Sequence, residues 1–237
     1  MKDITKRLSK SKLNTFKECP KKYYFTQYFP EEFIESEAMK RGSQLHQLLE
    51  DYYKKYNGKN IRTKESALKE FSKIEGNEEH FEEIKKFIDW LDKRGFPIPE
   101  SLEEKIYSKK QDIVIMWDRI DFDGKVRILW DYKTGKLYKG KQFIDKFKFE
   151  LMFYAFIYML ETKKKIDYVG IYFIDHGIQT LIKVTNEEIQ KIINEIFELK
   201  LEMKDYQKNN IWPGRYSWKC RWCNYKDRCE EYKQYNK

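Results

Sequence analysis

Residues 125–135, K-V-R-I-L-W-D-Y-K-T-G, are the most informative segment about the fold. Its side chains suit a β-strand, in which successive residues point to opposite faces. This alternation gives two sets, with Val126, Ile128 and Trp130 on one face and Arg127, Leu129, Asp131 and Lys133 on the other. The carboxylate of Asp131 and the ammonium of Lys133 are therefore expected to project side by side.

The preceding run, residues 113–121 (I-V-I-M-W-D-R-I-D), is also rich in β-forming residues, and Asp123-Gly124 between the two predicts a hairpin turn. Asp118 falls at the end of this neighbouring strand, so a tight turn brings it near Asp131. Two carboxylates can hold Mg²⁺ or Mn²⁺ through oxygen, and a lysine can orient an attacking water. A D-x-K pair alone is more often a solvated strand end, so the other motifs of the chain determine whether this pair is functional.

The rest of the chain shows helical and extended periodicity in separate segments. Helices are expected near residues 8–19, 41–56, 64–75, 78–94, 142–161 and 186–209, and further strands over 104–110, 167–174 and 179–184. This order predicts an α/β fold with a mixed sheet flanked by helices. We expect one domain over residues 1–237, with a helical region at 40–100, a sheet core at 101–185 and a cysteine-containing end at 186–237.

Composition narrows the class of partner. The chain has 237 residues and a formal net charge of +9, which suits a polyanion such as nucleic acid but also a generally lysine-rich protein. The first residues contain no apolar run typical of a signal peptide, and no stretch approaches a membrane span. A soluble, cytoplasmic protein is therefore expected, in which clustered thiols bind metal or act in catalysis more often than they form disulfides.

The four cysteines are Cys19, Cys220, Cys223 and Cys229. The spacing of the last three suits zinc, an iron–sulfur cluster or redox chemistry, and Cys19 is the remaining cysteine that could join them. Four aromatic residues lie around this motif among Lys and Arg: Trp212, Tyr216, Trp218 and Trp222. They could stack on single-stranded nucleic acid or shield a cluster from water.

These motifs together resemble the PD-(D/E)XK nuclease superfamily, in particular its RecB-like branch. The resemblance implies a restriction-endonuclease-like fold, with Asp118 as the first carboxylate and Asp131 and Lys133 as the D-x-K pair. Asp121 is the rival for the first carboxylate. The glycine that usually precedes that aspartate in the family is missing, since residues 115–117 are Ile-Met-Trp.

His46 lies four residues after Gly42, as in the helical G-x-x-x-H segment of that branch. The resemblance implies that His46, Asp118, Asp131 and the carbonyl of Tyr132 hold Mn²⁺ or Mg²⁺, although a single helical histidine is more often structural. It also implies substrate contacts from a later helix and from an upstream acid; the corresponding residues are Glu150, Tyr154 and Glu104. Tyr154 matches the pattern and is assigned to the catalytic set, whereas Glu150 replaces the family's glutamine.

In RecB-like nucleases with an iron–sulfur domain, one N-terminal cysteine joins three near the C-terminus. The resemblance therefore implies a 4Fe–4S cluster on Cys19, Cys220, Cys223 and Cys229, with zinc as the rival. CRISPR-associated exonucleases and AddB-type nuclease domains share this arrangement, so DNA, CRISPR adaptation proteins or a helicase are the implied partners, in adaptation, repair or recombination.

The expected function is a metal-dependent DNA nuclease, acting as an exonuclease on single strands or DNA ends. The first alternative is a catalytically weak, DNA-end-binding subunit of a larger complex, which the glutamate at 150 and the missing glycine favour. A second alternative is a zinc-bound regulator of nucleic acid, for which the D-x-K pair would be accidental.

Overall fold

The computed structural model describes residues 3–56, 61, 63–137 and 141–235, and it describes the side chains of these residues except 55–56 and 141–146. The helices in chain order are α1 (Lys10–Glu18), α2 (Pro20–Tyr28), η1 (Pro30–Glu32), α3 (Glu37–Tyr56), α4 (Lys64–Phe71), η2 (Glu78–His80), α5 (Phe81–Asp92), α6 (Lys141–Thr162), η3 (Ile174–His176), α7 (Asn186–Asn209), η4 (Trp218–Trp222), η5 (Lys226–Arg228) and α8 (Glu230–Tyr235). No helix within the described ranges is both long enough and apolar enough to cross a membrane.

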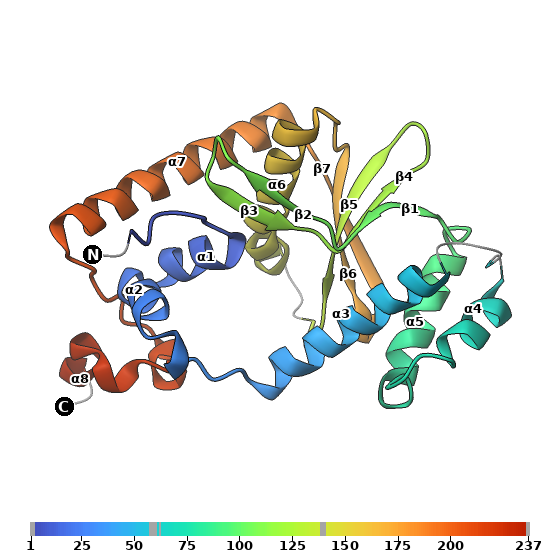
Figure 1. Cartoon of the computed structure of the whole chain (residues 1–237), viewed down its shortest axis with the longest axis horizontal. Coiled ribbons are helices and arrows are strands. Elements are labelled where there is room, and N and C mark those ends of the chain that lie inside the picture. The colour runs from blue at the N-terminus through green and yellow to red at the C-terminus, as the bar shows by residue number, and fades with distance from the viewer. Residues whose placement is uncertain (1–2, 57–60, 62, 138–140, 236–237) are drawn as a thin grey trace. The chain divides into compact units, whose positions relative to one another are not determined.

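The strands form a five-stranded sheet and a separate two-stranded sheet (Figure 1). Their bounds are β1 (Pro99–Leu102), β2 (Lys105–Ser108), β3 (Ile113–Met116), β4 (Arg119–Phe122), β5 (Arg127–Lys133), β6 (Tyr168–Phe173) and β7 (Ile178–Lys183). The large sheet has the order β1-β4-β5-β6-β7, in which β5 and β6 are parallel and the other neighbours antiparallel. The predicted mixed sheet flanked by helices is confirmed.

The run at residues 113–121 is not one strand. It divides into β3, which pairs with β2, and β4, which pairs with β1 and β5. Trp117 and Asp118 lie at the break, where the chain leaves one sheet for the other. Asp118 therefore lies between two strands rather than at the end of one continuous strand. The Asp123-Gly124 hairpin between β4 and β5 is present, with Gly124 at φ +93°.

The chain forms two compact units, one of Met1–Glu35, Tyr107–Ile115 and Gln190–Lys237, and one of Ser36–Ile106 and Met116–Ile189. The second unit contains the five-stranded sheet. Its core lies where α3, α4 and α5 pack on the sheet face that carries Trp130 and Tyr132. Gly170 on β6 is opposite Trp130, and a Cβ there would lie 2.4 Å from the indole, so glycine makes room for that ring.

Helix α6 packs on the opposite face of this sheet, the face of Asp131 and Lys133 (Figure 1). Its Tyr158 ring meets Trp117 edge to face, with 5.3 Å between centroids. The two faces of β5 are thus covered by different helices, and the alternation predicted for residues 125–135 is the pattern observed. Polar side chains at the end of β5 face α6 rather than the apolar core.

The other unit joins the N-terminal helices to α7 and the C-terminal tail. Ser9 caps α1, because its side chain accepts the N–H of Lys12. Phe16 of α1 packs against the rings of Tyr23, Tyr206 and Trp212, all within 6.3 Å between centroids. This aromatic core holds together segments that are nearly two hundred residues apart in the chain.

Candidate functional site

Asp118 is fixed against strand β5 by a backbone hydrogen bond. Its Oδ2 accepts the N–H of Tyr132 at 2.5 Å, although Asp118 lies in the break between β3 and β4. The backbone N–H of Glu103 donates to the carbonyl of Asp118 at 3.2 Å. These two hydrogen bonds bring the segment between β3 and β4 next to the ends of β1 and β5.

His46 reaches the same place from helix α3. Its Nδ1 lies 3.3 Å from Oδ1 of Asp118, and its Nε2 lies 3.2 Å from the carbonyl oxygen of Tyr132. The preceding turn of α3 comes close to the chain after β5, since a Cβ on Gly42 would lie 3.1 Å from Oγ1 of Thr134. Gly42 therefore allows the close approach of α3 that carries His46 to the strand.

Glu103 completes a group that the sequence did not single out. One donor atom each from His46, Glu103 and Asp118 lie within 4.8 Å of one another, a spacing that a single metal ion can bridge. Glu103 has φ +44°, a conformation uncommon for a residue with a side chain and often kept where function needs it. The upstream acid expected here was Glu104, which is exposed and accepts a hydrogen bond from Ser101 instead.

The charges of this group are strongly coupled. Burial by itself lowers the pKa of His46, but the carboxylates of Asp118, Asp131 and Glu103 together outweigh it and raise the pKa to about 9. Burial, together with the charge of Asp118, raises the pKa of Glu103 to about 8. Carboxylates that lie close together, so that a cation must compensate their negative charges, are typical of catalytic and metal-binding sites.

Asp131 and Lys133 project together on the α6 face of β5. The Lys133 ammonium lies 2.5 Å from Oδ2 of Asp131 and 3.4 Å from Oε2 of Glu150 on α6. Tyr154 lies one turn after Glu150 and is buried. The structure thus brings Glu150 to the lysine of the D-x-K pair, while Asp118 contacts the neighbouring backbone at Tyr132.

Asp121, the rival first carboxylate, occupies a different environment. Its Oδ1 accepts from Nε of Arg119 at 2.6 Å, and its Oδ2 accepts from Arg94 at 2.7 Å and from the Trp130 indole at 2.9 Å. It is only 5% exposed. These donors compensate its buried charge, which is the usual condition for a structural carboxylate.

Comparison with known proteins places this geometry in a family. The sequence model of the PD-(D/E)XK nuclease superfamily matches residues 7–230. The chain belongs to the PD-(D/E)XK nuclease superfamily. A search of the curated proteins gives no significant match.

Two crystal structures resemble this PD-(D/E)XK protein along nearly its whole length. One is a "Putative exonuclease" from Eubacterium rectale, with 13% identity, a TM-score of 0.57 and coverage of 97% of this chain and 88% of the other. The other is SSO0001, with 15% identity, a TM-score of 0.47 and coverage of 95% and 86%. At this identity the first similarity supports the fold alone.

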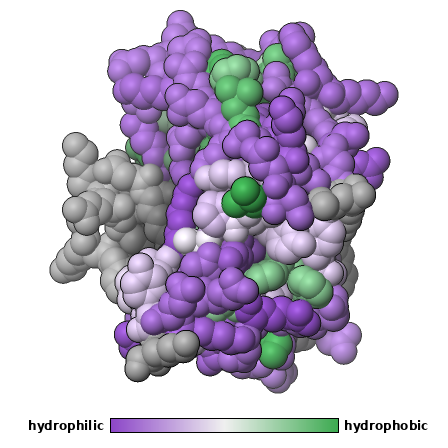
Figure 2. All heavy atoms as spheres, turned by 90° about the vertical axis from the view of Figure 1, so that its left-hand side faces the viewer, coloured by the Kyte–Doolittle hydropathy of each residue, from purple (hydrophilic) through white to green (hydrophobic). Residues whose placement is uncertain are grey.

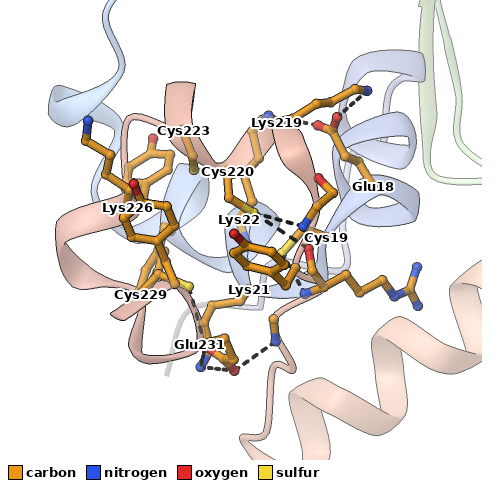
Figure 3. A pocket seen from close by; sticks show the side chains of 17 residues that line it. Glu18, Cys19, Lys21, Lys22, Lys219, Cys220, Cys223, Lys226, Cys229 and Glu231 are labelled. Carbon is orange, nitrogen blue, oxygen red and sulfur yellow. Dashed lines mark hydrogen bonds and ion pairs between the residues drawn. The ribbon is translucent and has the colours of Figure 1, made fainter. Parts of the chain in front are cut away.

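The cysteines of this superfamily member gather in the unit formed by the two ends of the chain. Cys19, Cys220, Cys223 and Cys229 are unpaired and line one cavity (Figure 3). Cys19 is at the N-cap of α2, where its sulfur accepts the N–H of Lys22, and also the N–H of Arg215, each at 3.4 Å. Backbone N–H groups directed at sulfur suit thiolates that bind metal.

Partial burial affects the protonation of two of these thiols. Burial raises the pKa of the thiols of Cys223 and Cys229, so a bound cation would be needed to hold them as thiolates.

Proposed function

We propose that this PD-(D/E)XK protein is a metal-dependent deoxyribonuclease of the RecB-like branch, acting as an exonuclease on single-stranded DNA or DNA ends. The observation that carries the proposal is the convergence of His46, Glu103 and Asp118 beside the carbonyl of Tyr132, next to Asp131 and Lys133. The proposal treats the whole chain as one nuclease domain in a cytoplasmic, reducing setting.

The donor set fits a divalent cation. His46, Asp118, Asp131 and the Tyr132 carbonyl would hold Mn²⁺ or Mg²⁺, with Glu103 as an additional carboxylate, and a histidine nitrogen favours Mn²⁺. When bound, such an ion polarises a phosphodiester and lowers the pKa of a bound water. The protein's own part is to hold its carboxylates in place, which the Tyr132 N–H does for Asp118.

Lys133 is the group that would act on the water. Asp131 and Glu150 hold its ammonium between them, 2.5 and 3.4 Å away. From there it would orient a water whose oxygen forms the new bond to phosphorus, while the bond to the leaving sugar oxygen breaks and that oxygen takes up a proton. The positive charge of Lys133 would also offset the charge that develops on the phosphate oxygens. Tyr154, one turn beyond Glu150, would help to position the substrate.

We also propose that Cys19, Cys220, Cys223 and Cys229 hold a 4Fe–4S cluster. Support comes from the shared cavity and from the N–H groups directed at Cys19. Such a cluster would couple the two ends of the chain to the folding of their unit.

The nuclease proposal is tested on protein purified without oxygen. DNA labelled at the 5′ or 3′ end, single- or double-stranded, is incubated with Mn²⁺, Mg²⁺ or EDTA beside Asp131→Ala and Asp118→Asn. We expect degradation that needs the metal, progresses from one labelled end and falls by at least about 100-fold in both variants, as loss of transition-state charge stabilisation would cause. Activity that persists in both variants would contradict this site.

The cluster proposal has its own test, independent of cleavage. Iron and zinc are measured in wild-type protein and in Cys19→Ser, with visible absorption and electron paramagnetic resonance after reduction. About four irons in the wild type and their loss in Cys19→Ser are expected. Zinc without iron would instead favour the zinc-bound form.

The alternative of a catalytically weak DNA-end-binding subunit draws on Glu150, whose carboxylate shares Lys133 with Asp131. A helicase or CRISPR adaptation proteins would then be its partners in the larger complex. DNA binding without cleavage in any metal would establish this alternative over the nuclease.

A further inference from the structure

The short helix η4 carries two tryptophans that the rest of the protein does not cover. Trp218 and Trp222 are 65% and 64% exposed, whereas the chain's other four tryptophans are at most 6% exposed. Indoles are among the largest apolar side chains, so two adjacent exposed ones mark a surface that contacts something else. We call Trp218, Arg221 and Trp222 the η4 platform.

The two indoles do not shield the cysteine cavity. Lys219, Cys220 and Cys223 line that cavity from the same segment, as Figure 3 shows, but Trp218 and Trp222 do not contribute to its lining. With about three residues per turn, a 3₁₀ helix places Cys220 and Cys223 on one side and Trp218 and Trp222 on the other two sides. The indoles therefore have another role than protection of the sulfurs.

The two rings are held close together. Their centroids are 5.4 Å apart and their planes are at 87°, an edge-to-face pair that fixes both rings. The guanidinium of Arg221 lies 4.9 Å from the centroid of the Trp222 ring. Among the described residues, Arg221 has no carboxylate partner, in contrast to Lys219, which pairs with Glu18. An uncompensated cation thus lies beside two exposed aromatic rings.

The surroundings are charged rather than apolar. Residues 215–228 contain five Lys or Arg and one acidic residue. Three of these five cations, Arg215, Lys219 and Arg228, pair with glutamates of other segments. The face of the molecule that includes this tail is predominantly hydrophilic, and its strongly hydrophobic residues are separate spots (Figure 2). A protein partner would favour a continuous apolar centre, so this combination fits a polyanion that also offers flat rings.

We propose that the η4 platform binds single-stranded DNA by stacking unpaired bases on Trp218 and Trp222 while Arg221 contacts the phosphate backbone. Single strands fit because the bases of a duplex are already stacked on one another and do not offer their faces. Aromatic rings beside a basic surface bind single strands with little dependence on sequence. This inference deepens the proposed nuclease function by giving its substrate a second contact in the cysteine-containing unit.

The test measures binding separately from cleavage. Full-length protein purified without oxygen, carrying Asp131→Ala, is titrated in EDTA with fluorescein-labelled oligothymidylate or a blunt duplex of equal length, and anisotropy gives Kd. In this background Trp218→Ala/Trp222→Ala is expected to weaken binding to the single strand at least about tenfold, since each stacked base contributes measurably. Duplex affinity is expected to change by less than about twofold.

Three controls separate stacking from misfolding. Trp218→Phe/Trp222→Phe keeps aromatic rings and is expected to retain most of the affinity. Phe197→Ala removes a ring that is 62% exposed on α7 and is expected to change nothing. Bound metal and circular dichroism are compared in all variants. For Arg221→Gln, the slope of log affinity against log salt should fall by about 0.7.

The outcomes are distinct. If the alanine pair binds oligothymidylate as tightly as the background, or if the phenylalanine pair is equally weak, the platform does not bind by stacking. If DNA affinity is unchanged, we would infer that the two indoles bind a protein partner instead. Because binding is measured without divalent metal, failure of the nuclease proposal would not alter these readouts.

Discussion

Gly42 of helix α3 packs directly against Thr134, which follows strand β5. A Cβ at position 42 would lie 3.1 Å from Oγ1 of Thr134. His46 is one helical turn further along α3, and its ring contacts both Asp118 and the Tyr132 carbonyl. The Gly42–Thr134 contact therefore sets how closely the histidine approaches the end of the strand.

This contact predicts a defect that a second substitution relieves. Gly42→Ala should raise the Mn²⁺ concentration needed for half-maximal activity several-fold, because the helix must move from Thr134. Alanine favours a helix over glycine by about 1 kcal/mol, so unfolding stability should not fall. Gly42→Ala/Thr134→Ala removes Oγ1 and should restore the metal requirement. An unrestored double variant would show that the contact does not position His46.

Glu103 and Glu104 form a matched pair for a test of the additional carboxylate. Glu103→Gln should weaken Mn²⁺ binding at least about tenfold, since it removes one charged oxygen donor from the group. Glu104→Gln should leave Mn²⁺ binding unchanged, because that exposed side chain contacts Ser101 instead. Isothermal titration with Mn²⁺ gives both values. Equal effects, or an effect of Glu104→Gln alone, would remove Glu103 from the metal site.

Asp118 and Asp121 should respond in opposite ways to the same change. Asp121→Asn breaks a buried pair with Arg119 and Arg94, and should lower the free energy of unfolding by about 3–5 kcal/mol. Asp118→Asn should abolish Mn²⁺-dependent cleavage while altering stability less. Urea unfolding in EDTA and cleavage of labelled DNA provide the two readouts. The reverse pattern would identify Asp121 as the metal-binding carboxylate.

Glu100 gives the sheet a pH-dependent contribution. A hydrogen bond from Arg127 is the largest effect on its carboxylate and, with Lys164, holds the pKa of Glu100 below its usual value despite partial burial. A lowered pKa in the folded state stabilises the fold above the usual pKa of about 4.3, and that stabilisation is lost as the pH falls through the folded value.

Glu100→Gln should therefore lower the free energy of unfolding by up to about 1 kcal/mol at pH 7, because solvent screens this partly exposed ion pair. The difference from wild type should shrink as the pH is lowered below about 4. Urea unfolding at both pH values measures it, with the exposed Glu78→Gln as the control. A difference that is independent of pH would mean that packing, not the ion pair, is lost.

Much of the local structure could be predicted without coordinates. The alternation of residues 125–135 gave the faces of β5, and the periodicity of residues 186–209 gave the bounds of α7. Each depends on neighbouring residues and on backbone periods of 2 or 3.6. Strand β1 was not predicted, because Gly-Phe-Pro-Ile-Pro, which leads into it at residues 95–99, is typical of the end of a helix.

Tertiary pairing decided what local pattern could not. Residues 113–121 read as one strand, yet β3 and β4 pair in different sheets, and Asp118 lies at the break where it accepts the Tyr132 N–H. The adjacent glutamates 103 and 104 have the same local propensity, but the φ of +44° at Glu103 and its hydrogen bond to the Asp118 carbonyl select one of them.

Residue type and spacing along the chain were enough to predict the strand with Asp131 and Lys133, the helix with His46 and the candidate set of four cysteines. Three features depend on the folded structure instead: Glu103 joins His46 and Asp118, Glu150 contacts Lys133, and Trp218 and Trp222 stay exposed. Side chains distant in sequence meet because packing and hydrogen bonds fix the backbone in three dimensions, and no local period encodes that arrangement.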